Sequence, residues 1–393
     1  MNSACLALNM GEQFSAGPPQ GKLAPSGGSD DTAVRSVGVA LVMAGGTGGH
    51  IFPGLAVAQA LRERGWRVHW LGGAGSAAQP SMESRLVPAQ GFAFEAVDFS
   101  GVRGKGWSTL VGLPWRLLRA CWQSLAVLRR VRPDVVLGLG GYISFPAGLM
   151  SVLLGKPLLL HEQNSVAGMA NKLLSRVAKR VFTAFPDAIA NGCWIGNPLR
   201  ANFIGVAEPA VRFAKRSGPL RLLVLGGSLG ARALNDVVPQ ALALLPAQQR
   251  PVVLHQSGAA QIDALSANYT RAGVQAQLTP FIDDTAQALA DADLVICRAG
   301  ASTVTEIAAV GAAALFVPFP SAVDDHQTRN ARFLVDRGAG WLVPQLQLSP
   351  QWLANWLQEV ERDALLKCAQ QARKLQKLDA SSQIVAACEE LMR

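Results

Sequence analysis

Short apolar runs alternate with longer stretches of helical periodicity along most of the chain. The apolar runs lie at 38–43, 67–71, 134–139, 157–161 and 180–183 and, after Asn197 and Pro198, at 221–225, 251–255, 276–278, 294–297 and 314–317. Strands that alternate with helices are typical of parallel βαβ units, which occur here in two successive sets. The pattern predicts an α/β fold of two Rossmann-like domains that face each other across a cleft, with ligands at the C-terminal ends of the strands.

The ends of the chain fall outside this alternation. Residues 1–36 are rich in Gly, Ser, Pro and Ala and carry no periodicity, so we expect a disordered tail. We expect residues 37–198 to form the first domain and residues 199–393 the second. Helical stretches at 350–360 and 381–392 close the chain. The second of them packs either on the second domain or back on the first.

One segment is long enough to span a bilayer. Residues 135–155 contain no charged side chain over 21 positions. Gly138, Gly140, Gly141 and Pro146 interrupt its first half, however, and favour a buried strand, a glycine loop and a core helix.

Charge is distributed unevenly between the two halves. Residues 1–200 contain 19 Lys and Arg against 10 Asp and Glu, whereas residues 201–393 contain 17 of each. The asymmetry indicates that the first half meets an anionic partner such as a membrane, a nucleic acid or a phosphorylated substrate. The six cysteines form no CxxC pair, which favours reduced thiols in a cytosolic protein over disulfides or a zinc site.

The first predicted strand runs into a glycine-rich loop and a helix. The loop is Gly45-Gly46-Thr47-Gly48-Gly49, and His50 stands where the helix begins. Glycines allow a close approach of the backbone, and a helix N-terminus attracts phosphate. A tight turn without a ligand is the alternative. The spacing fits neither a dinucleotide-binding GxGxxG nor a P-loop. His50 is either a structural cap or a surface residue of the first turn, or it is a substrate-binding group or general base.

Further loops of this kind follow other predicted strands. Gly140-Gly141-Tyr142 follows 134–139, and Gly226-Gly227-Ser228 follows 221–225. Three such loops indicate one or two ligands with several phosphates. The polar residues His161, Glu162, Gln163 and Asn164 follow another strand, where they suit hydroxyl and amide recognition. Helix capping by Asn164 or Ser165 is the alternative.

The second half has two more polar segments at strand ends. In the segment 297–311, Ser302 or Thr303 is expected to cap a helix whose Glu306 either completes the cap or accepts hydrogen bonds from a ribose diol. The segment 318–331 then supplies Asp325, His326, Gln327 and Asn330 at the start of another helix.

A basic and aromatic stretch lies between Asp98 and Asp134. Its seven Lys and Arg residues are interleaved with Trp and Leu and with no acidic residue. This mixture suits an anionic bilayer surface better than nucleic acid, and a core helix with a solvated basic face is the alternative. The membrane candidates are Arg103, Lys105, Trp107, Trp115, Arg116 and Arg119.

Together these segments resemble the MurG family, bacterial transferases that add N-acetylglucosamine to lipid I in peptidoglycan synthesis. The resemblance covers about 38–390 and rests on "GGTGGHIFP", "HEQNSVAG", "GNPLR", "GGSLGARALN" and "FPSAVDDHQTRNA". It implies a GT-B fold, no metal and no cofactor, UDP-GlcNAc as donor and lipid I as acceptor. It also implies a peripheral location on the cytoplasmic side of the inner membrane, with cell-wall and division proteins as further partners and no nucleic acid.

The resemblance also implies a site. His50 corresponds to the family's candidate base. The implied UDP-GlcNAc contacts are Thr47, Gly48, Gly49, Asn164, Arg200, Ser228, Ile282, Ala301, Ser302, Thr303, Val304, Thr305, Glu306 and Gln327. Among them, Arg200 and Ser228 would meet the diphosphate, the Ile282 backbone the uracil and Glu306 the ribose. The acceptor diphosphate would meet Gly45, Gly46, Gly140, Gly141 and Tyr142.

The implied reaction inverts the anomeric carbon of the donor sugar. Ser321 stands where the family usually has a histidine, which puts any role of that histidine in doubt here.

Two other functions remain as alternatives. A UDP-sugar epimerase of similar fold would use the same glycine and acidic residues without a membrane patch. A non-catalytic membrane scaffold would explain the patch but not His50, Asn164 and Glu306.

Overall fold

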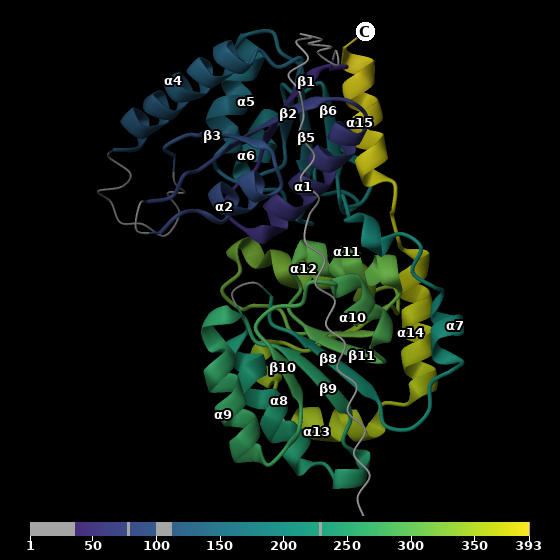
Figure 1. Ribbon diagram of the computed structural model, residues 1–393. Coiled ribbons are helices and arrows are strands. Elements are labelled where there is room, and N and C mark those ends of the chain that lie inside the picture. Colours follow the sequence, from purple (N-terminus) through teal and green to yellow (C-terminus); the bar gives the residue numbers. More distant parts are fainter. Residues whose placement is uncertain (1–35, 77–78, 100–111, 228–229, 393) are drawn as a thin grey trace, which may run out of the picture. The chain divides into compact units, whose positions relative to one another are not determined.

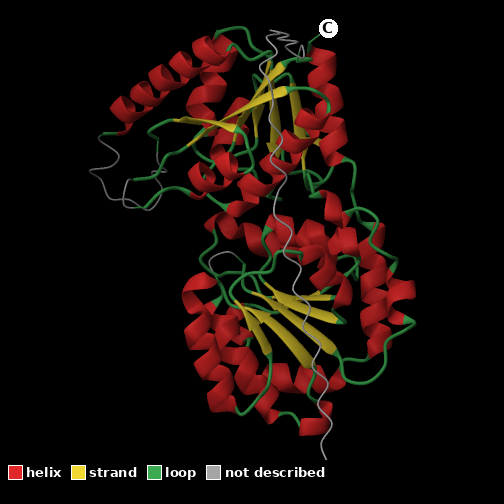
Figure 2. Cartoon of the chain, viewed as in Figure 1, coloured by secondary structure: helices red, strands yellow, loops and turns green. Residues whose placement is uncertain are grey.

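Two parallel sheets organise the chain (Figures 1 and 2). The computed structural model describes residues 36–76, 79–99, 112–227 and 230–392, so the expected disordered tail lies outside the described residues except for Ser36. The first sheet has the strand order β3-β2-β1-β4-β5-β6-β7 and the second β10-β9-β8-β11-β12-β13. Both follow the doubly wound order, which reverses direction beside the first strand of each set. The predicted pair of Rossmann-like α/β domains is confirmed.

The first set of elements spans residues 39–194. Its strands are β1 (Val39–Met43), β2 (Arg67–Gly72), β3 (Ala93–Ala96), β4 (Val135–Gly138), β5 (Leu158–Glu162), β6 (Arg180–Thr183) and β7 (Cys193–Trp194). Its helices are α1 (Gly48–Glu63), α2 (Met82–Ala89), α4 (Leu113–Val131), α5 (Ser144–Leu153) and α6 (Met169–Leu174).

The second set follows after Pro198. Its strands are β8 (Arg221–Leu225), β9 (Val252–Gln256), β10 (Gln277–Thr279), β11 (Leu294–Cys297), β12 (Ala314–Phe316) and β13 (Trp341–Leu342). Its helices are α7 (Pro209–Phe213), α8 (Arg232–Leu244), α9 (Ile262–Ala272), α10 (Thr285–Asp291), α11 (Ala301–Val310), α12 (His326–Val335), α13 (Pro350–Glu359), α14 (Arg362–Lys374) and α15 (Ala380–Leu391).

Each sheet is buried on both faces, which explains the continuous apolar runs of its central strands. Successive side chains of a strand point to opposite faces. Accordingly, Ala40 and Val42 of β1 pack in one core cluster, and Leu41 and Met43 pack in another on the opposite face. Strands covered on both sides in this way need apolar residues at every position.

All ten predicted strands are present, within one residue at each end. Three further strands, β3, β7 and β13, escaped prediction. They lie at sheet edges, and none of their residues is fully buried, so their sequences carry no continuous apolar run. The segment 135–155 forms β4, a glycine loop and α5, as predicted. Among the helices of the described residues, none has both the length and the apolar character needed to cross a bilayer.

The last helix returns to the first sheet. Ala380, Ile384 and Cys388 of α15 share a buried cluster with Ile51 and Val57 of α1. Figure 1 shows α15, in yellow, beside α1. The chain therefore passes between the two sheets twice, near Gly196 and again between α14 and α15. These passages touch, because a Cβ on Gly196 would collide with the Cβ of Lys377.

Candidate active site

Two glycine loops meet where the strand order of the first sheet reverses, beside β1 and β4. Gly140 and Gly141, which follow β4, have φ of +86° and +84°, a conformation that favours glycine. A Cβ on Gly141 would lie 2.5 Å from the carbonyl oxygen of Gly45, in the loop that follows β1. The two backbones are therefore in direct contact, and any side chain larger than hydrogen would separate them.

His50 lies in the first turn of α1 and reaches the end of another strand. Its Nδ1 lies 2.9 Å from Oε1 of Gln163, which directly follows β5. Thr47 is the N-cap residue, so the interpretation of His50 as a cap is wrong. Within the described part of the chain, the amide N–H groups of Gly48 and Gly49 have no acceptor. An imidazole and two open helix N-terminal amides therefore share one site, which suits an anionic ligand.

A buried carboxylate that sequence reasoning missed supports the first glycine loop. Glu83, from α2, is 3% exposed, and its Oε1 accepts from the amides of Gly46 and Gly73, each at 3.3 Å. The Gly46 amide therefore already has an acceptor inside the protein. Any diphosphate contact at this loop has to use other groups, such as the Gly48 and Gly49 amides. Tyr142 is 42% exposed and packs edge-on against Phe99.

Of the four polar residues expected to follow a strand, His161 and Glu162 instead lie within β5, and most of the four are internal, contrary to the expectation that all of them recognise a ligand. His161, Glu162 and Gln163 are at most 2% exposed. The Glu162 carboxylate accepts from the Asn164 amide at 3.0 Å and from Nδ2 of Asn171 at 2.8 Å, so it shapes the loop. Asn164 alone of the four is partly exposed.

Asn330, in α12, connects this loop to the second sheet. Its Oδ1 accepts from the amide and the hydroxyl of Ser165, at 2.9 and 2.7 Å. Its Nδ2 donates to Oδ1 of Asn164 at 3.4 Å and to the carbonyl of Ala299, which follows β11, at 3.2 Å. The buried Asn330 side chain thus brings Asn164 close to the strand end that precedes α11.

Helix α11 begins differently from the prediction. Its N-cap residue is Gly300, with no side-chain cap, so the expected capping by Ser302 or Thr303 is wrong. The side chains of Ala301, Val304 and Thr305 are buried, and the Thr305 hydroxyl donates to the Ala301 carbonyl at 3.0 Å. In this turn only Ser302, Thr303 and Glu306 are partly exposed residues, and the Ser302 hydroxyl oxygen is buried without a partner among the described residues. A ligand contact at the other three would use the backbone.

Glu306 has an unusual electrostatic environment. Burial raises the pKa of its carboxyl to about 7, and the nearby positive charge of Arg200 opposes this rise. Arg200 donates to the Thr285 hydroxyl at 2.9 Å, which holds its guanidinium beside the start of α10. A carboxyl group with a pKa near neutrality gains most when a ligand supplies hydrogen-bond donors to its ionised form.

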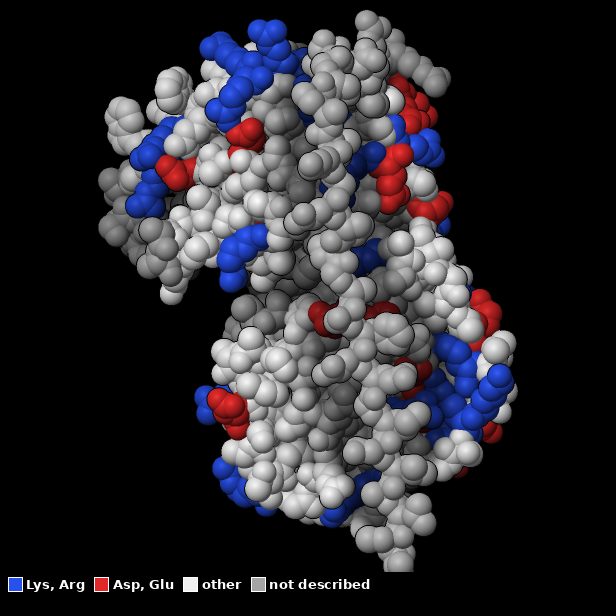
Figure 3. All heavy atoms as spheres, in the orientation of Figure 1, with Lys and Arg blue, Asp and Glu red and all other residues white. Residues whose placement is uncertain are grey.

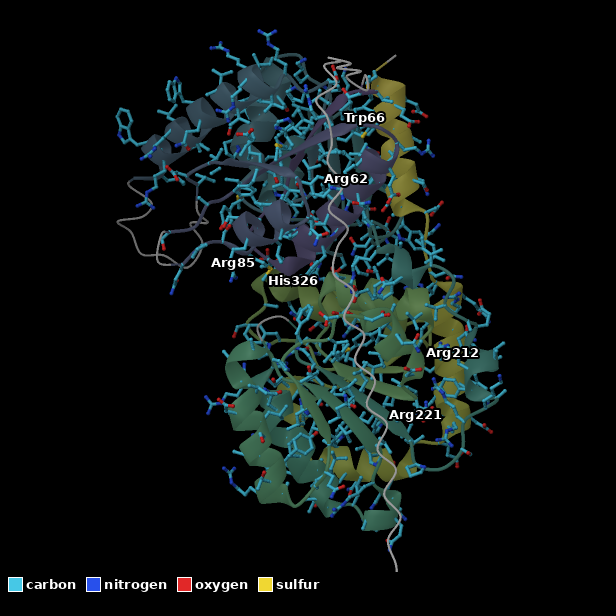
Figure 4. The ribbon with its side chains drawn as sticks, viewed as in Figure 1. Arg62, Trp66, Arg85, Arg212, Arg221 and His326 are labelled. Carbon is cyan, nitrogen blue, oxygen red and sulfur yellow. The ribbon has the colours of Figure 1, made fainter. Side chains whose placement is uncertain are left out.

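The far end of α11 is fixed by arginines. Arg212, from α7 (labelled in Figure 4), donates to the carbonyls of Val310, at 2.8 Å, and Gly311. Arg373, from α14, donates to the carbonyl of Ala309. Burial and the charges of Arg216 and Arg373 lower the pKa of Arg212 to about 10. Cations at the C-terminal end satisfy its free carbonyls and hold the helix that carries Glu306.

Other expected donor contacts lie at neighbouring strand ends. Gln327, next to His326 at the start of α12 (Figure 4), accepts at Oε1 from the amides of Ala299 (3.3 Å) and Phe319 (2.9 Å). Within the described residues, its Nε2 has no acceptor, and neither backbone group of Ile282 has a partner. Ser228 lies outside the described residues, and Ser321 is exposed.

Gln256, a second residue that sequence reasoning missed, supports the loop that precedes Ser228. It ends β9 and is 5% exposed. Its Oε1 accepts from the Gly227 amide at 3.1 Å, and its Nε2 donates to the carbonyls of Gly227 and Pro280. One buried amide thus holds the glycine loop and the segment that leads to Ile282.

The expected membrane surface falls partly on α4. Trp115, Leu118 and Trp122 are 77%, 61% and 73% exposed and lie along one face of this helix. Arg119 pairs with Asp98 at 2.8 Å and Arg130 with Glu95, so carboxylates that precede α4 in the chain neutralise part of its charge (Figure 3). Arg116 is exposed, whereas Arg103, Lys105 and Trp107 lie outside the described residues.

Family models match both halves of the chain. The glycosyltransferase family 28 N-terminal domain matches residues 40–183, and the family's C-terminal domain matches residues 221–384. The chain belongs to glycosyltransferase family 28. Family 28 relatives from Albidiferax ferrireducens and Polaromonas sp. are 77% and 72% identical, and each match covers 96% of this chain and at least 96% of the relative. Both are named UDP-N-acetylglucosamine--N-acetylmuramyl-(pentapeptide) pyrophosphoryl-undecaprenol N-acetylglucosamine transferase.

Solved structures agree with this family 28 assignment. The crystal structure of Acinetobacter baumannii MurG matches with a TM-score of 0.76 and 39% identity, over 90% of this chain and 99% of that one. A putative UDP-N-acetylglucosamine 2-epimerase from Listeria monocytogenes matches with a TM-score of 0.61 and 15% identity, over 90% of this chain and 96% of that one. At that identity the epimerase shares the fold alone. The chain is therefore a GT-B glycosyltransferase of the MurG type.

Proposed function

We propose that this protein transfers N-acetylglucosamine from UDP-GlcNAc to the 4-hydroxyl of the N-acetylmuramyl sugar of lipid I, with inversion at the anomeric carbon. The product is lipid II, the precursor of peptidoglycan. The observation that carries the proposal is the position of His50, whose imidazole is held by Gln163 beside two open amides at the start of α1. The names of relatives that are 77% and 72% identical support it.

In this reaction His50 acts as the general base. The acceptor's 4-hydroxyl oxygen attacks C1 of the sugar from the face opposite UDP, and its proton passes to the imidazole. The bond from C1 to the diphosphate oxygen breaks at the same time, and its electron pair leaves with UDP. Arg200 and the helix that follows Gly227 supply the positive charge for the leaving diphosphate.

The remaining residues recognise the two substrates. Glu306 accepts the ribose hydroxyls, the Ile282 backbone meets the uracil, and Asn164 and Gln327 bind the donor sugar. The Gly48 and Gly49 amides, which the family resemblance assigns to UDP-GlcNAc, also face the acceptor diphosphate, together with the loop from Gly140 to Tyr142. Ser228 completes the diphosphate site in the second half.

Turnover with and without acceptor tests the proposal. The protein is incubated with UDP-GlcNAc alone and with a soluble lipid I analogue, and UDP release and sugar epimerisation are both measured. The proposal expects UDP release only when the acceptor is present. Epimerised sugar without acceptor would support the epimerase alternative, and no turnover at all would support the scaffold. In the His50→Ala variant, turnover should fall about 100-fold or more while UDP binds normally.

We also propose that the exposed face of α4 rests on the cytoplasmic side of the inner membrane. Lipid I carries a polyprenyl chain, so the half that binds it has to reach the bilayer. Trp115, Leu118 and Trp122 suit the interfacial layer, and Arg116 and Arg129 suit anionic headgroups. Association with cell-wall and division proteins stays a prediction.

Vesicle binding tests the membrane contact. Trp115→Ser with Trp122→Ser, or Arg116→Gln with Arg129→Gln, should weaken co-sedimentation with anionic vesicles and slow transfer to a long-chain acceptor. Activity on a short soluble acceptor should stay close to wild type. Lys215→Gln with Lys367→Gln, an equal loss of exposed charge in the other half, is the control. Unchanged vesicle binding by both α4 variants would exclude this face as the membrane contact.

A further inference from the structure

Two buried side chains behind His50 connect it to a backbone carbonyl. Nδ1 of His50 contacts Oε1 of Gln163 at 2.9 Å, and Nε2 of Gln163 lies 3.2 Å from Nδ1 of His161. Nε2 of His161 lies 2.8 Å from the carbonyl oxygen of Gly196. His161 and Gln163 are 2% and 0% exposed, so water does not compete for these contacts.

The carbonyl of Gly196 determines which atom donates in each of these three hydrogen bonds. A carbonyl oxygen only accepts, so Nε2 of His161 carries the hydrogen. Burial lowers the pKa of His161 to about 4, which keeps this imidazole neutral at physiological pH and makes its Nδ1 an acceptor. The group of Gln163 that faces it is therefore the NH2, and the amide oxygen faces His50. His50 in turn has to donate from Nδ1.

The surroundings hold this arrangement in place. A Cβ on Gly140 would lie 2.7 Å from Nδ1 of His50 and 3.0 Å from Oε1 of Gln163, so the glycine loop closes over their hydrogen bond. At the other end, the Gly196 amide donates to the carbonyl of Thr183, which ends β6, so the residue that carries the accepting carbonyl is anchored to this strand. The described residues offer Nδ1 of His50 no other partner.

We propose that Gln163 and His161 are positioning residues that hold His50 in the Nδ1–H tautomer, so that Nε2 is the atom that takes the proton of the acceptor hydroxyl. This inference rests on the proposed function and assigns the reacting atom within it. In free histidine the neutral imidazole prefers the opposite tautomer, with hydrogen on Nε2. In that tautomer Nε2 has no lone pair available to accept a proton. The hydrogen bond made by one ring nitrogen thus decides whether the other can act as a base.

The tautomer is directly measurable without turnover. In protein labelled with 15N-histidine, at a pH above the ordinary range of histidine titration, the nitrogen shifts distinguish N–H from bare nitrogen. We expect His50, assigned by loss of its signals in His50→Gln, to carry hydrogen on Nδ1, and His161 to carry it on Nε2. In Gln163→Leu, His50 should move toward the Nε2–H form. A wild-type His50 with hydrogen on Nε2, or an unchanged tautomer in Gln163→Leu, would overturn the proposal.

Kinetics separate positioning from general damage to the fold. Gln163→Leu should lower kcat at least about tenfold and leave the KM for UDP-GlcNAc close to wild type. Gln163→Glu keeps an acceptor for Nδ1 of His50 but loses the NH2 that faces Nδ1 of His161, so it should recover only part of kcat. The matched control is Gln256→Leu, which removes another buried glutamine, one that supports the donor loop, and should raise the KM for UDP-GlcNAc instead. Equal loss of kcat in Gln163→Leu and Gln163→Glu, with both folded, would contradict the proposal.

These outcomes are distinguishable from a failure of the proposed function. If the protein shows no acceptor-dependent UDP release, the reaction assignment fails whatever the tautomer of His50 is. If transfer occurs but the nitrogen shifts place hydrogen on Nε2, the reaction stands and the role of Gln163 and His161 is wrong.

Discussion

Glu306 has a carboxyl group that is close to half ionised at neutral pH in the free protein. Its pKa of about 7 results from burial, which the charge of Arg200 only partly offsets. A ribose diol donates two hydrogen bonds to a carboxylate and stabilises the ionised form. The proposed ribose contact would therefore link donor binding to the ionisation of this one residue.

Removing the charge of Glu306 should weaken donor binding in a pH-dependent way. We expect Glu306→Gln to bind UDP-GlcNAc about 10- to 150-fold more weakly at pH 8, the loss of a charge-assisted hydrogen bond. Wild-type affinity should rise from pH 6 to pH 8 as the carboxyl ionises, and the variant should lack this rise. Calorimetry with UDP-GlcNAc measures the affinity of each protein at each pH, and this ligand has no terminal phosphate whose titration would interfere. Parallel pH profiles for the two proteins would exclude Glu306 as the ribose acceptor.

The same residue should make the fold less stable at high pH. The folded state keeps the Glu306 proton up to pH about 7, whereas the unfolded state loses it near the ordinary value of 4.5. The contribution of Glu306 to the free energy of unfolding therefore falls as pH rises from 4.5 to 7. Glu306→Gln should be more stable than wild type at pH 8, by on the order of 2 kcal/mol, and equal to it near pH 4. Denaturant unfolding at the two pH values checks this; a constant difference between them contradicts it.

At the scale of elements, buried polar side chains from distant parts of the chain support two of the glycine loops and the candidate base. Glu83 holds the loop after β1, and Gln256 holds the loop after β8. Gln163 holds His50 at the start of α1. Glycine-rich loops have little side-chain packing of their own, so such supports determine their shape.

The contact between the first two glycine loops should be intolerant of a single methyl group. Gly141→Ala would place its Cβ 2.5 Å from the Gly45 carbonyl, with φ at +84°. Gly155→Ala is the matched control, because Gly155 also has positive φ, +69°, but nothing within 4 Å of its Cβ position. Gly155→Ala should cost about 1–2 kcal/mol for the backbone conformation alone, and Gly141→Ala clearly more. Equal losses of thermal stability would show that the loops are free to separate.

The sequence predicted the central strands but not all of the supports, for a physical reason. Strands such as β1 and β8 are buried on both faces, so their pattern is continuous and local. Edge strands such as β3 lack that signal. Glu83 acts on Gly46, 37 positions away, and Gln163 on His50, 113 positions away, and no local pattern encodes such pairs. The N-cap of α11 is Gly300, whose backbone is extended where the helix begins and which has no side chain to signal a cap in the sequence.

At the scale of the whole molecule, α15 completes a core that begins with β1. Five of its residues, Ala380, Ile384, Val385, Ala387 and Cys388, are buried in the cluster that contains side chains of α1. Two exposed ion pairs, Arg64–Glu389 and Arg180–Glu390, add little to this packing.

Deletion of residues 379–393 should therefore damage the first half of the protein more than the second. Burial of apolar side chains is the main source of stability, and the deletion exposes the face of α1 that α15 covers. We expect lower thermal stability and binding of a hydrophobic dye, with faster hydrogen exchange in β1 and α1 than in β8 and α8. Uniform exchange in both halves would contradict the prediction. Ile384→Ala is the milder test and should cost about 2–5 kcal/mol.

The return of α15 also sets an order of events during synthesis. A ribosome adds residues from the N-terminus, and domains usually fold in that order as they emerge. Here the second sheet has all of its strands once β13 has left the ribosome, whereas the first half still lacks part of its core until the last helix has been made. The half that is synthesised first is thus the half that is finished last, and its unprotected apolar face would be a natural substrate for chaperones throughout translation.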